Sequence, residues 1–414
     1  MSVDTFVVRW TKISLHFLVF AAVAVATLRF YNLAPIIGIN YKFLLHAHSH
    51  IAMLGWLYIV VAALLVKEFI PDQAVKINKV LGTTVIMIIG MMLSFPFQGY
   101  GLVSITFSTF FLFTSYWFVV VFLRKLREKN NKSLANRWIR WALFFLLISS
   151  IGPWSLGPIM LFGEKHGTLY NLAIYYYLHF LYNGFLLPAV FGIILKHLEN
   201  NQIKFNIERA KLFFQLTVYP IIPLYALSLL WLKPSIWVYI IGGLAALMQL
   251  VGIMIGWPIL RTYWQSIKQK FYKALFGLVL TAYSFKLFLQ IISSLPVIAE
   301  YVYQTRVFTA IGYIHLVMLG FLSMFILIYT IINKNLRDNK VVRFGLVVFI
   351  TGLILSEIIL FTNGLLLYTK GVSISNYSQW LFYASILMPI GLMVMWVIQL
   401  KRKTNRNEAT VLKT

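Results

Sequence analysis

Long apolar runs repeat along this chain of 414 residues and restrict the folds open to it. About twenty apolar residues in a helix cross the hydrocarbon core of a bilayer. Twelve such runs predict an all-α, polytopic membrane protein with about 12 transmembrane helices. The third run is the shortest and ends at Pro96. The predicted spans are Ile13–Leu33, Leu44–Val66, Val80–Phe95, Leu102–Leu123, Trp138–Phe162, Tyr170–Leu195, Leu212–Leu232, Ile236–Leu260, Phe271–Ile292, Val307–Ile332, Phe344–Leu367 and Trp380–Leu400.

The composition excludes a water-soluble globule, because 60% of the residues are hydrophobic and only 11% are charged. The chain has no cysteine. Disulfides, thiolate metal ligands and a cysteine nucleophile are therefore excluded. Any metal site must use histidine, methionine, tyrosine or carboxylate side chains.

Positive charge is distributed unequally between the two sides of the predicted spans. Of 36 Lys and Arg residues, 29 lie on the side of the N-terminus, six lie on the opposite side, and Lys286 lies within a span. This asymmetry follows the positive-inside rule, so the net charge of +25 indicates orientation in a lipid membrane and not nucleic-acid binding. We predict a bacterial cytoplasmic membrane protein with both termini inside, comprising one transmembrane domain at residues 1–400 and a basic cytoplasmic tail at 401–414.

A His-x-x-x-x-Gly pattern occurs three times, in the second, sixth and tenth predicted spans. The copies are His50-Ile-Ala-Met-Leu-Gly55, His179-Phe-Leu-Tyr-Asn-Gly184 and His315-Leu-Val-Met-Leu-Gly320. All three spans start from the outer face, so the three histidines lie at one level in the outer half of the membrane. Recurrence every four helices predicts three pseudo-symmetric four-helix arcs around a common axis.

An imidazole among apolar side chains is costly unless it is hydrogen-bonded or binds a ligand. Neutral imidazole is a common ligand of haem iron and also suits copper. Two of these histidines on facing helices can hold a haem between them. The glycine of each copy leaves room for a macrocycle or for a neighbouring helix. The alternative is that each histidine hydrogen-bonds a tyrosine or a backbone carbonyl across a helix interface.

The run from His46 to His50 adds two further histidines. If it is helical, His46 and His50 lie on one face and His48 points the other way. One of them is a candidate iron ligand, and the others are candidates for binding copper, carrying protons or contacting haem propionates. The alternative is that His46 and His48 lie in the wet interface of the membrane.

Lys286 and Glu357 are the only residues of their charge types well inside the predicted spans. Three roles are open to them: they pair with each other, Lys286 neutralises haem propionates, or Glu357 belongs to a proton path. A lysine that only extends toward the membrane surface is the alternative for Lys286.

The helix count, the inside termini and the histidines of spans two, six and ten resemble subunit I of haem–copper oxidases and nitric oxide reductases. The run His46-Ala-His48-Ser-His50-Ile-Ala-Met-Leu-Gly55 is similar to the His-Ala-His-x-x-x-x-Gly stretch of the NnrS family. Those are haem- and copper-containing membrane proteins linked to nitric oxide stress. The resemblance implies haem, and copper as a second cofactor, in respiratory electron transfer or nitric oxide handling, with other respiratory-chain subunits as partners.

The resemblance also implies site residues. A low-spin haem would lie between spans two and ten, with His48 or His50 as one ligand and His315 as the other. His179 would match a copper ligand, so the candidate metal ligands are His46, His50, His179 and His315. The chain departs from the oxidases because span ten has one histidine where they have two, and span seven has none. The usual dinuclear centre cannot form with its normal ligands, and we do not expect oxygen reduction.

Two other classes of function remain open. A proton-coupled secondary transporter without haem also has twelve helices with cytoplasmic termini, and its histidines, Lys286 and Glu357 would couple protons. An assembly partner without cofactor would be colourless and would co-purify with another complex. If the protein is an enzyme, the resemblance points to an oxidoreductase of the oxidase or nitric oxide reductase type.

Overall fold

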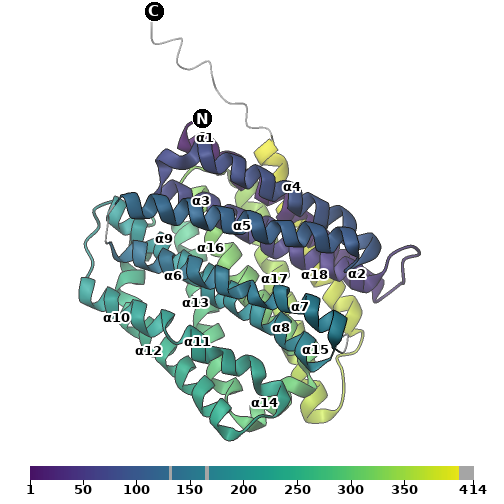
Figure 1. Cartoon of the computed structure of the whole chain (residues 1–414). Helices are drawn as coiled ribbons and strands as arrows, with labels where there is room; N and C mark the ends of the chain where they lie inside the picture. Colours follow the sequence, from purple (N-terminus) through teal and green to yellow (C-terminus); the bar gives the residue numbers. More distant parts are fainter. Residues whose placement is uncertain (130–132, 164–166, 401–414) are drawn as a thin grey trace, which may run out of the picture.

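The computed structural model describes residues 1–129, 133–163 and 167–400 (Figure 1). Within these residues the chain is helical and contains no strand, and twelve helical spans are long and apolar enough to cross a membrane. The predicted all-α polytopic fold is therefore confirmed. The predicted tail at 401–414 lies outside the described residues.

Seven of the twelve spans consist of one regular helix or of a helix with a short initial turn. They are α1 (Val3–Tyr31), η2 with α4 (Pro71–Gln73 and Ala74–Gln98), α5 (Leu102–Glu128), α12 (Ile236–Ser266), α13 (Lys270–Ser293), α17 (Lys340–Lys370) and α18 (Tyr377–Leu400).

Five spans change their helical form part-way. They are α2, η1 and α3 (Tyr41–His50, Ile51–Tyr58, Ile59–Phe69); α6 and α7 (Leu134–Ser149, Ile151–Phe162); α8, η3 and α9 (Thr168–His179, Phe180–Leu186, Leu187–Asn200); α10, α11 and η4 (Ile207–Val218, Ile221–Leu224, Tyr225–Leu232); and α15, η5 and α16 (Arg306–His315, Leu316–Ser323, Met324–Ile332).

The third span corrects a sequence prediction. It covers Pro71–Gln98, with Pro96 inside α4, instead of ending before that proline. A proline two residues from the end of a helix removes one hydrogen bond but leaves little helix beyond it to disrupt. The chain also contains a short helix that the hydropathy pattern did not predict, α14 (Pro296–Gln304), between spans nine and ten.

The start of the first span, α1, and the end of the last span, α18, lie on the same side of the bundle. Lys12 near the start of α1 donates a hydrogen bond of 2.6 Å to the carbonyl of Gln399 at the end of α18. We call the opposite side of the bundle the distal side. Spans two, six and ten begin there, so the starts of α2, α8 and α15 share one side of the membrane.

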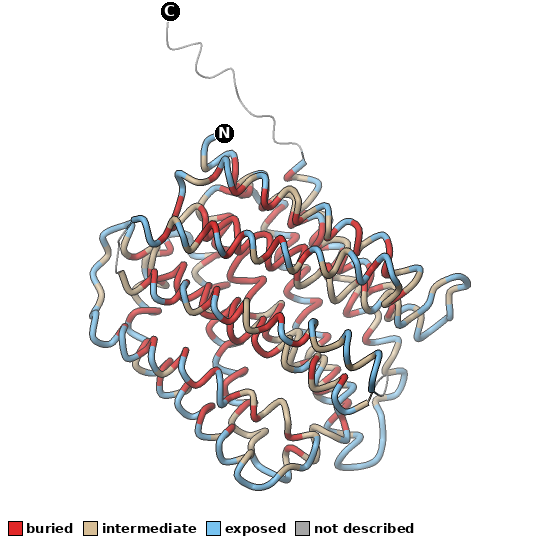
Figure 2. Tube along the Cα trace, viewed as in Figure 1, coloured by how far each residue is buried: buried red, intermediate tan, exposed pale blue. Residues whose placement is uncertain are grey.

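The three spans that carry the repeated motif form the centre of the bundle. In their most apolar windows, 78%, 89% and 61% of the residues are buried, against 33–50% in the other nine spans. Figure 2 shows this buried core inside a more exposed outer layer. The central position of every fourth span agrees with the predicted recurrence of the motif.

Each copy of the motif occupies the same structural position. His50, His179 and His315 are the last residues of α2, α8 and α15, and a π-helical segment (η1, η3 or η5) begins at the next residue in each case. π-Helical segments are rare and often occur at functional sites. The three-fold recurrence therefore extends from the sequence to the backbone geometry.

Two of the repeated glycines allow close helix packing. A Cβ atom on Gly55 would lie 2.7 Å from Phe17 of α1, and one on Gly184 would lie 2.6 Å from Phe145 of α6. Gly320 has only an ordinary contact at this position, 3.4 Å from Ala282. The expected uses of these glycines were room for a macrocycle or for a neighbouring helix. Gly55 and Gly184 serve the second use.

Candidate functional site

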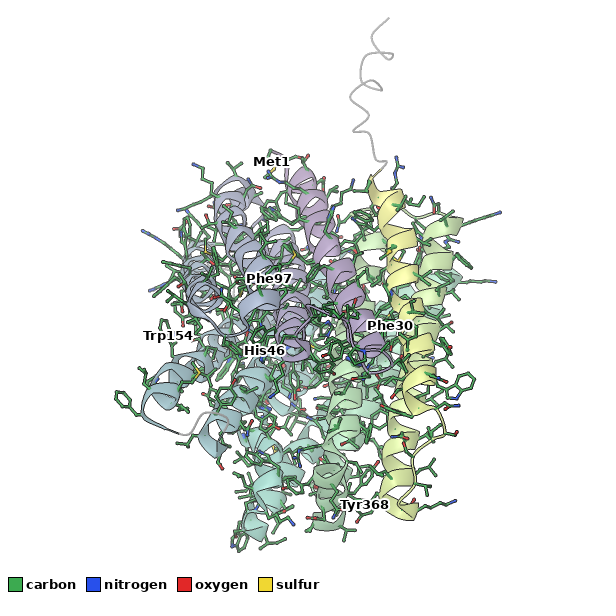
Figure 3. All side chains as sticks on the ribbon, turned by 90° about the vertical axis from the view of Figure 1, so that its right-hand side faces the viewer. Met1, Phe30, His46, Phe97, Trp154 and Tyr368 are labelled. Carbon is green, nitrogen blue, oxygen red and sulfur yellow. The ribbon has the colours of Figure 1, made fainter. Side chains whose placement is uncertain are left out.

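A cavity of about 610 Å³ lies between the distal halves of several spans. Its walls come from α1, α2, η1, α5, α7, α8, α15 and η5, with additional residues from α17 and α18. His46, His48 and His50 of α2 and His315 of α15 all line it. His46, which Figure 3 labels, contacts the ring of Phe95 of α4.

The local sequence of α2 explains how its histidines reach this position. The side chain of Asn40 accepts a hydrogen bond from the backbone N–H of Phe43 and so begins the helix. One helical turn separates His46 from His50, and both rings contact those of Phe95 and Tyr100. His48 faces the other way and bonds α1. This is the arrangement predicted from the helical spacing.

The rings of His48 and His50 are oriented by backbone carbonyls. Nδ1 of His48 donates to the carbonyl of Ala21 at 2.8 Å, and Nδ1 of His50 donates to the carbonyl of His46 at 2.9 Å. A carbonyl oxygen can only accept a hydrogen bond, so Nδ1 of each ring carries the proton. In the neutral ring, Nε2 then carries the lone pair. Metal-binding histidines are commonly oriented in this way.

His315 faces a carboxylate across the helix interface. Its Nδ1 atom lies 3.6 Å from Oε1 of Glu357 on α17, and the side chains are only 15% and 13% exposed. Neither Nδ1 nor either carboxylate oxygen has a hydrogen-bond partner. His315 lines the same cavity as His48. The structure thus brings together residues of spans two, ten and eleven.

Arg29 supplies a cation to the same cavity and was not a candidate site residue in the sequence. It lies in the last turn of α1, lines the cavity, and has a buried Nε atom without a hydrogen-bond partner. It shares the cavity with His48 and His315. The sequence did contain a signal for Arg29: Lys and Arg are rare on the side of the predicted spans opposite the N-terminus, where only six of them lie.

His179 occupies a different place. Its Nε2 atom donates to the carbonyl of Ile221 at 2.8 Å, and its Nδ1 atom accepts from the side chain of Asn183 at 3.3 Å. It does not belong to the described residues that line the cavity. Ile221 begins α11, where Pro220 and Pro223 interrupt span seven. His179 therefore satisfies a backbone carbonyl at this break, which matches the alternative of hydrogen bonding across a helix interface.

Lys286 and Glu357 do not pair with each other. Lys286 is 1% exposed, donates to Oε1 of Gln249 at 3.3 Å, and lies 5.5 Å from the ring centre of Tyr283. Gln249 in turn donates to the carbonyl of Thr217, close to the break in span seven. Lys286 is not among the described residues that line the cavity, whereas Arg29 is.

The metal-binding capacity of the site is limited. In the part of the chain that the structure describes, no three histidine, aspartate or glutamate side chains come close enough to hold one metal ion. The candidate ligands His46, His50, His179 and His315 therefore do not form one centre. A pair of axial ligands on opposite faces of a haem has no such requirement, because the macrocycle supplies the other four.

A scan against models of known protein families matches no part of the chain, and a search of curated proteins finds none with a similar sequence. The resemblance to oxidase subunit I and to NnrS proteins consequently rests on the motif and the topology. It is developed below as a proposal.

Proposed function

We propose that this chain is a haem-binding integral membrane protein related in fold to subunit I of haem–copper oxidases and to NnrS proteins. The observation that carries the proposal is one cavity shared by His48 and His315, which belong to different spans. Its volume falls within the range of about 300–1,000 Å³ that small-molecule and cofactor sites occupy. The predominantly apolar walls suit the face of a macrocycle.

The residues of the cavity suit distinct parts of a haem. His48 and His315 would hold the haem iron, because His48 presents a lone pair on Nε2 and His315 lies on another wall of the same cavity. Arg29 is the proposed partner of a haem carboxylate, since its buried Nε atom lacks an acceptor. His50 is the less suitable of the two α2 candidates because its ring is stacked on Phe95 at 4.4 Å.

Bound haem would supply one-electron redox chemistry, which fits electron transfer or nitric oxide handling in a bacterial cytoplasmic membrane. The chain would hold the macrocycle, exclude water from it and set the orientation of its ligands. We do not extend the proposal to copper, because the described side chains gather no three ligands for it. The cytoplasmic side of the termini rests on the charge distribution.

The test is a reduced-minus-oxidised absorption spectrum of the purified protein, produced with ample haem, together with iron and copper analysis of the same sample. We expect the sharp bands of a six-coordinate haem in the wild type and their loss in His48→Ala and His315→Ala. His16→Ala is the matched control, because His16 is exposed on α1 and bonds the carbonyl of Lys12. Retention of the haem in both cavity variants would contradict the proposal.

The second candidate function is proton-coupled transport without haem. The observation that favours it is the carboxylate of Glu357, which has no hydrogen-bond partner among the described residues and lies 3.6 Å from Nδ1 of His315. Membrane-embedded carboxylate and imidazole groups of this kind carry protons in transporters. A colourless, iron-free protein that takes up protons in vesicles would support this function and exclude the first.

A further inference from the structure

The cavity extends to the lipid-facing surface between α5 and α7. Among its lining residues, Ile105 of α5 is 37% exposed, Trp154 of α7 is 44% exposed, and Gly157 is exposed as well. A Cβ atom added to Gly157 would meet nothing within 4 Å. The seam between the two helices therefore has open space at the height of the cavity, in a region that faces lipid chains.

The helix that forms one side of this seam, α7, follows a break in its span and contains two prolines. α6 ends at Ser149 and α7 begins at Ile151. Pro153 has no N–H group for the carbonyl of Ser149, and Pro158 has none for the carbonyl of Trp154, so the helical ladder is weakened twice. At Gly152 the base of α7 packs tightly on α8, because a Cβ atom there would lie 2.5 Å from the carbonyl of Ala173.

A small set of contacts holds the seam closed. Nε1 of Trp154 donates to the hydroxyl of Tyr116 on α5 at 2.8 Å, and that hydroxyl donates to Oγ of Ser150 at 2.6 Å. The ring of Trp154 also contacts that of Phe113, with 5.7 Å between centroids. Figure 3 shows Trp154 on the same outer flank of the bundle as His46. Trp154 thus joins α7 to α5.

We propose that the protein takes up and releases its macrocycle through this seam, directly from the membrane. The inference rests on the proposed function, because it concerns the same cavity and names haem dissolved in lipid as the incoming ligand. A planar macrocycle with apolar edges partitions into lipid, and an apolar edge can enter an apolar seam first. Its carboxylates then meet Arg29, and the histidines of α2 and α15 lie on the inner walls.

The experiment measures the rate at which cofactor-free protein in nanodiscs acquires haem from haem-loaded liposomes of zwitterionic lipid. Gly157→Trp fills the open space, and we expect it to slow uptake by at least about tenfold, a barrier increase of about 1.4 kcal/mol. Gly82→Trp on α4 is the matched control, because a Cβ atom at Gly82 also meets nothing within 4 Å.

Trp154→Ala provides an independent variant, since it removes the closing contacts and leaves the lining otherwise intact. We expect faster uptake and faster loss of haem to apomyoglobin in solution. Equal rates in wild type, Gly157→Trp and Trp154→Ala, with haem bound in all three, would overturn this inference alone. A wild type that binds no haem would overturn the proposed function and this inference with it.

Discussion

A histidine inside a membrane span needs a partner for its ring nitrogens, and this protein meets that need in two ways. His48 gives one nitrogen to the carbonyl of Ala21 and keeps the other for the cavity. His179 uses both nitrogens within the protein. Residues with the same motif therefore serve different purposes, one in the site and one in the fold.

This difference predicts the effect of His179→Ala. The substitution leaves the carbonyl of Ile221 without a donor inside the membrane, so we expect a loss of about 1–3 kcal/mol in the free energy of unfolding. The haem spectrum should be retained. The measurement is thermal unfolding in detergent together with the absorption spectrum, with His16→Ala as the neutral control. Loss of a bound metal at unchanged thermal stability would instead assign His179 to a metal site.

At the scale of elements, the π-helical segments are the feature that the three central spans share. A π-helical turn contains an additional residue and is unfavourable by itself, so its recurrence needs support from packing. Phe17 packs against the backbone at Gly55 of η1, and Phe145 packs in the same way at Gly184 of η3. The repeated glycine thus allows the neighbouring helices α1 and α6 to hold two of these segments in place.

The packing at η1 predicts that Gly55→Ala destabilises the protein. The added Cβ atom would lie 2.7 Å from the ring of Phe17, and overpacking of this kind costs about 1–3 kcal/mol. Gly82→Ala on α4 is the matched control, because it meets open space and improves helix propensity. Thermal unfolding of the two variants should place Gly55→Ala well below the wild type and Gly82→Ala at or above it. Equal midpoints would show that η1 repacks freely.

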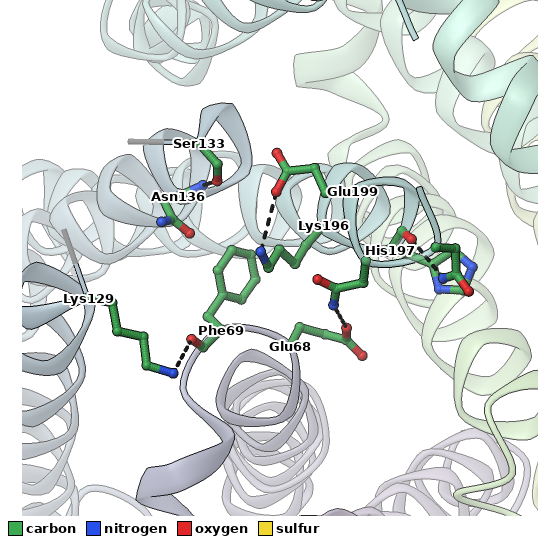
Figure 4. Close-up of polar contacts among 10 residues, drawn as sticks. Glu68, Phe69, Lys129, Ser133, Asn136, Lys196, His197 and Glu199 are labelled. Atoms are coloured by element: carbon green, nitrogen blue, oxygen red, sulfur yellow. Dashed lines mark hydrogen bonds and ion pairs between the residues drawn. The ribbon is translucent and has the colours of Figure 1, made fainter. Parts of the chain in front are cut away.

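At the scale of the whole molecule, Glu68 joins the three central spans at the end opposite the cavity. Figure 4 shows Glu68 with one of its hydrogen bonds as a dashed line. Its Oε1 atom accepts a hydrogen bond of 2.7 Å from Tyr329 of α16, and its Oε2 atom accepts one of 3.1 Å from Asn200 of α9. Glu68 itself lies in the last turn of α3, one residue before its end at Phe69. The three motif-bearing spans are consequently fixed to one another at one end while their other ends surround a cavity.

We therefore predict that Glu68→Ala loosens this end of the bundle. Tyr329 and Asn200 lose their acceptor, and we expect a loss of about 1–3 kcal/mol in the free energy of unfolding. Backbone amides near the end of α16 should exchange faster with deuterium, as read by mass spectrometry. Glu208→Ala is the matched control, because the side chain of Glu208 is 79% exposed and pairs only with Lys211. Equal exchange in both variants would contradict the joining role.

The sequence by itself determined the helical membrane fold, the twelve spans and the opposite faces of His48 and His50. These properties are local, since apolar length sets a span and helical periodicity sets a face. Some boundaries were predicted wrongly from the sequence, such as the end of the third span at Pro96, because membrane helices accommodate a proline near their ends.

Only the tertiary structure decided which histidines share a cavity. His315 and His48 line one cavity because spans two and ten pack at the centre of the bundle, and Arg29 joins them from α1. The same packing places His179 in hydrogen-bond contact with the interrupted span seven, and Lys286 in hydrogen-bond contact with Gln249. Contacts between residues hundreds of positions apart depend on how whole helices pack, and no periodicity within a single span encodes that arrangement.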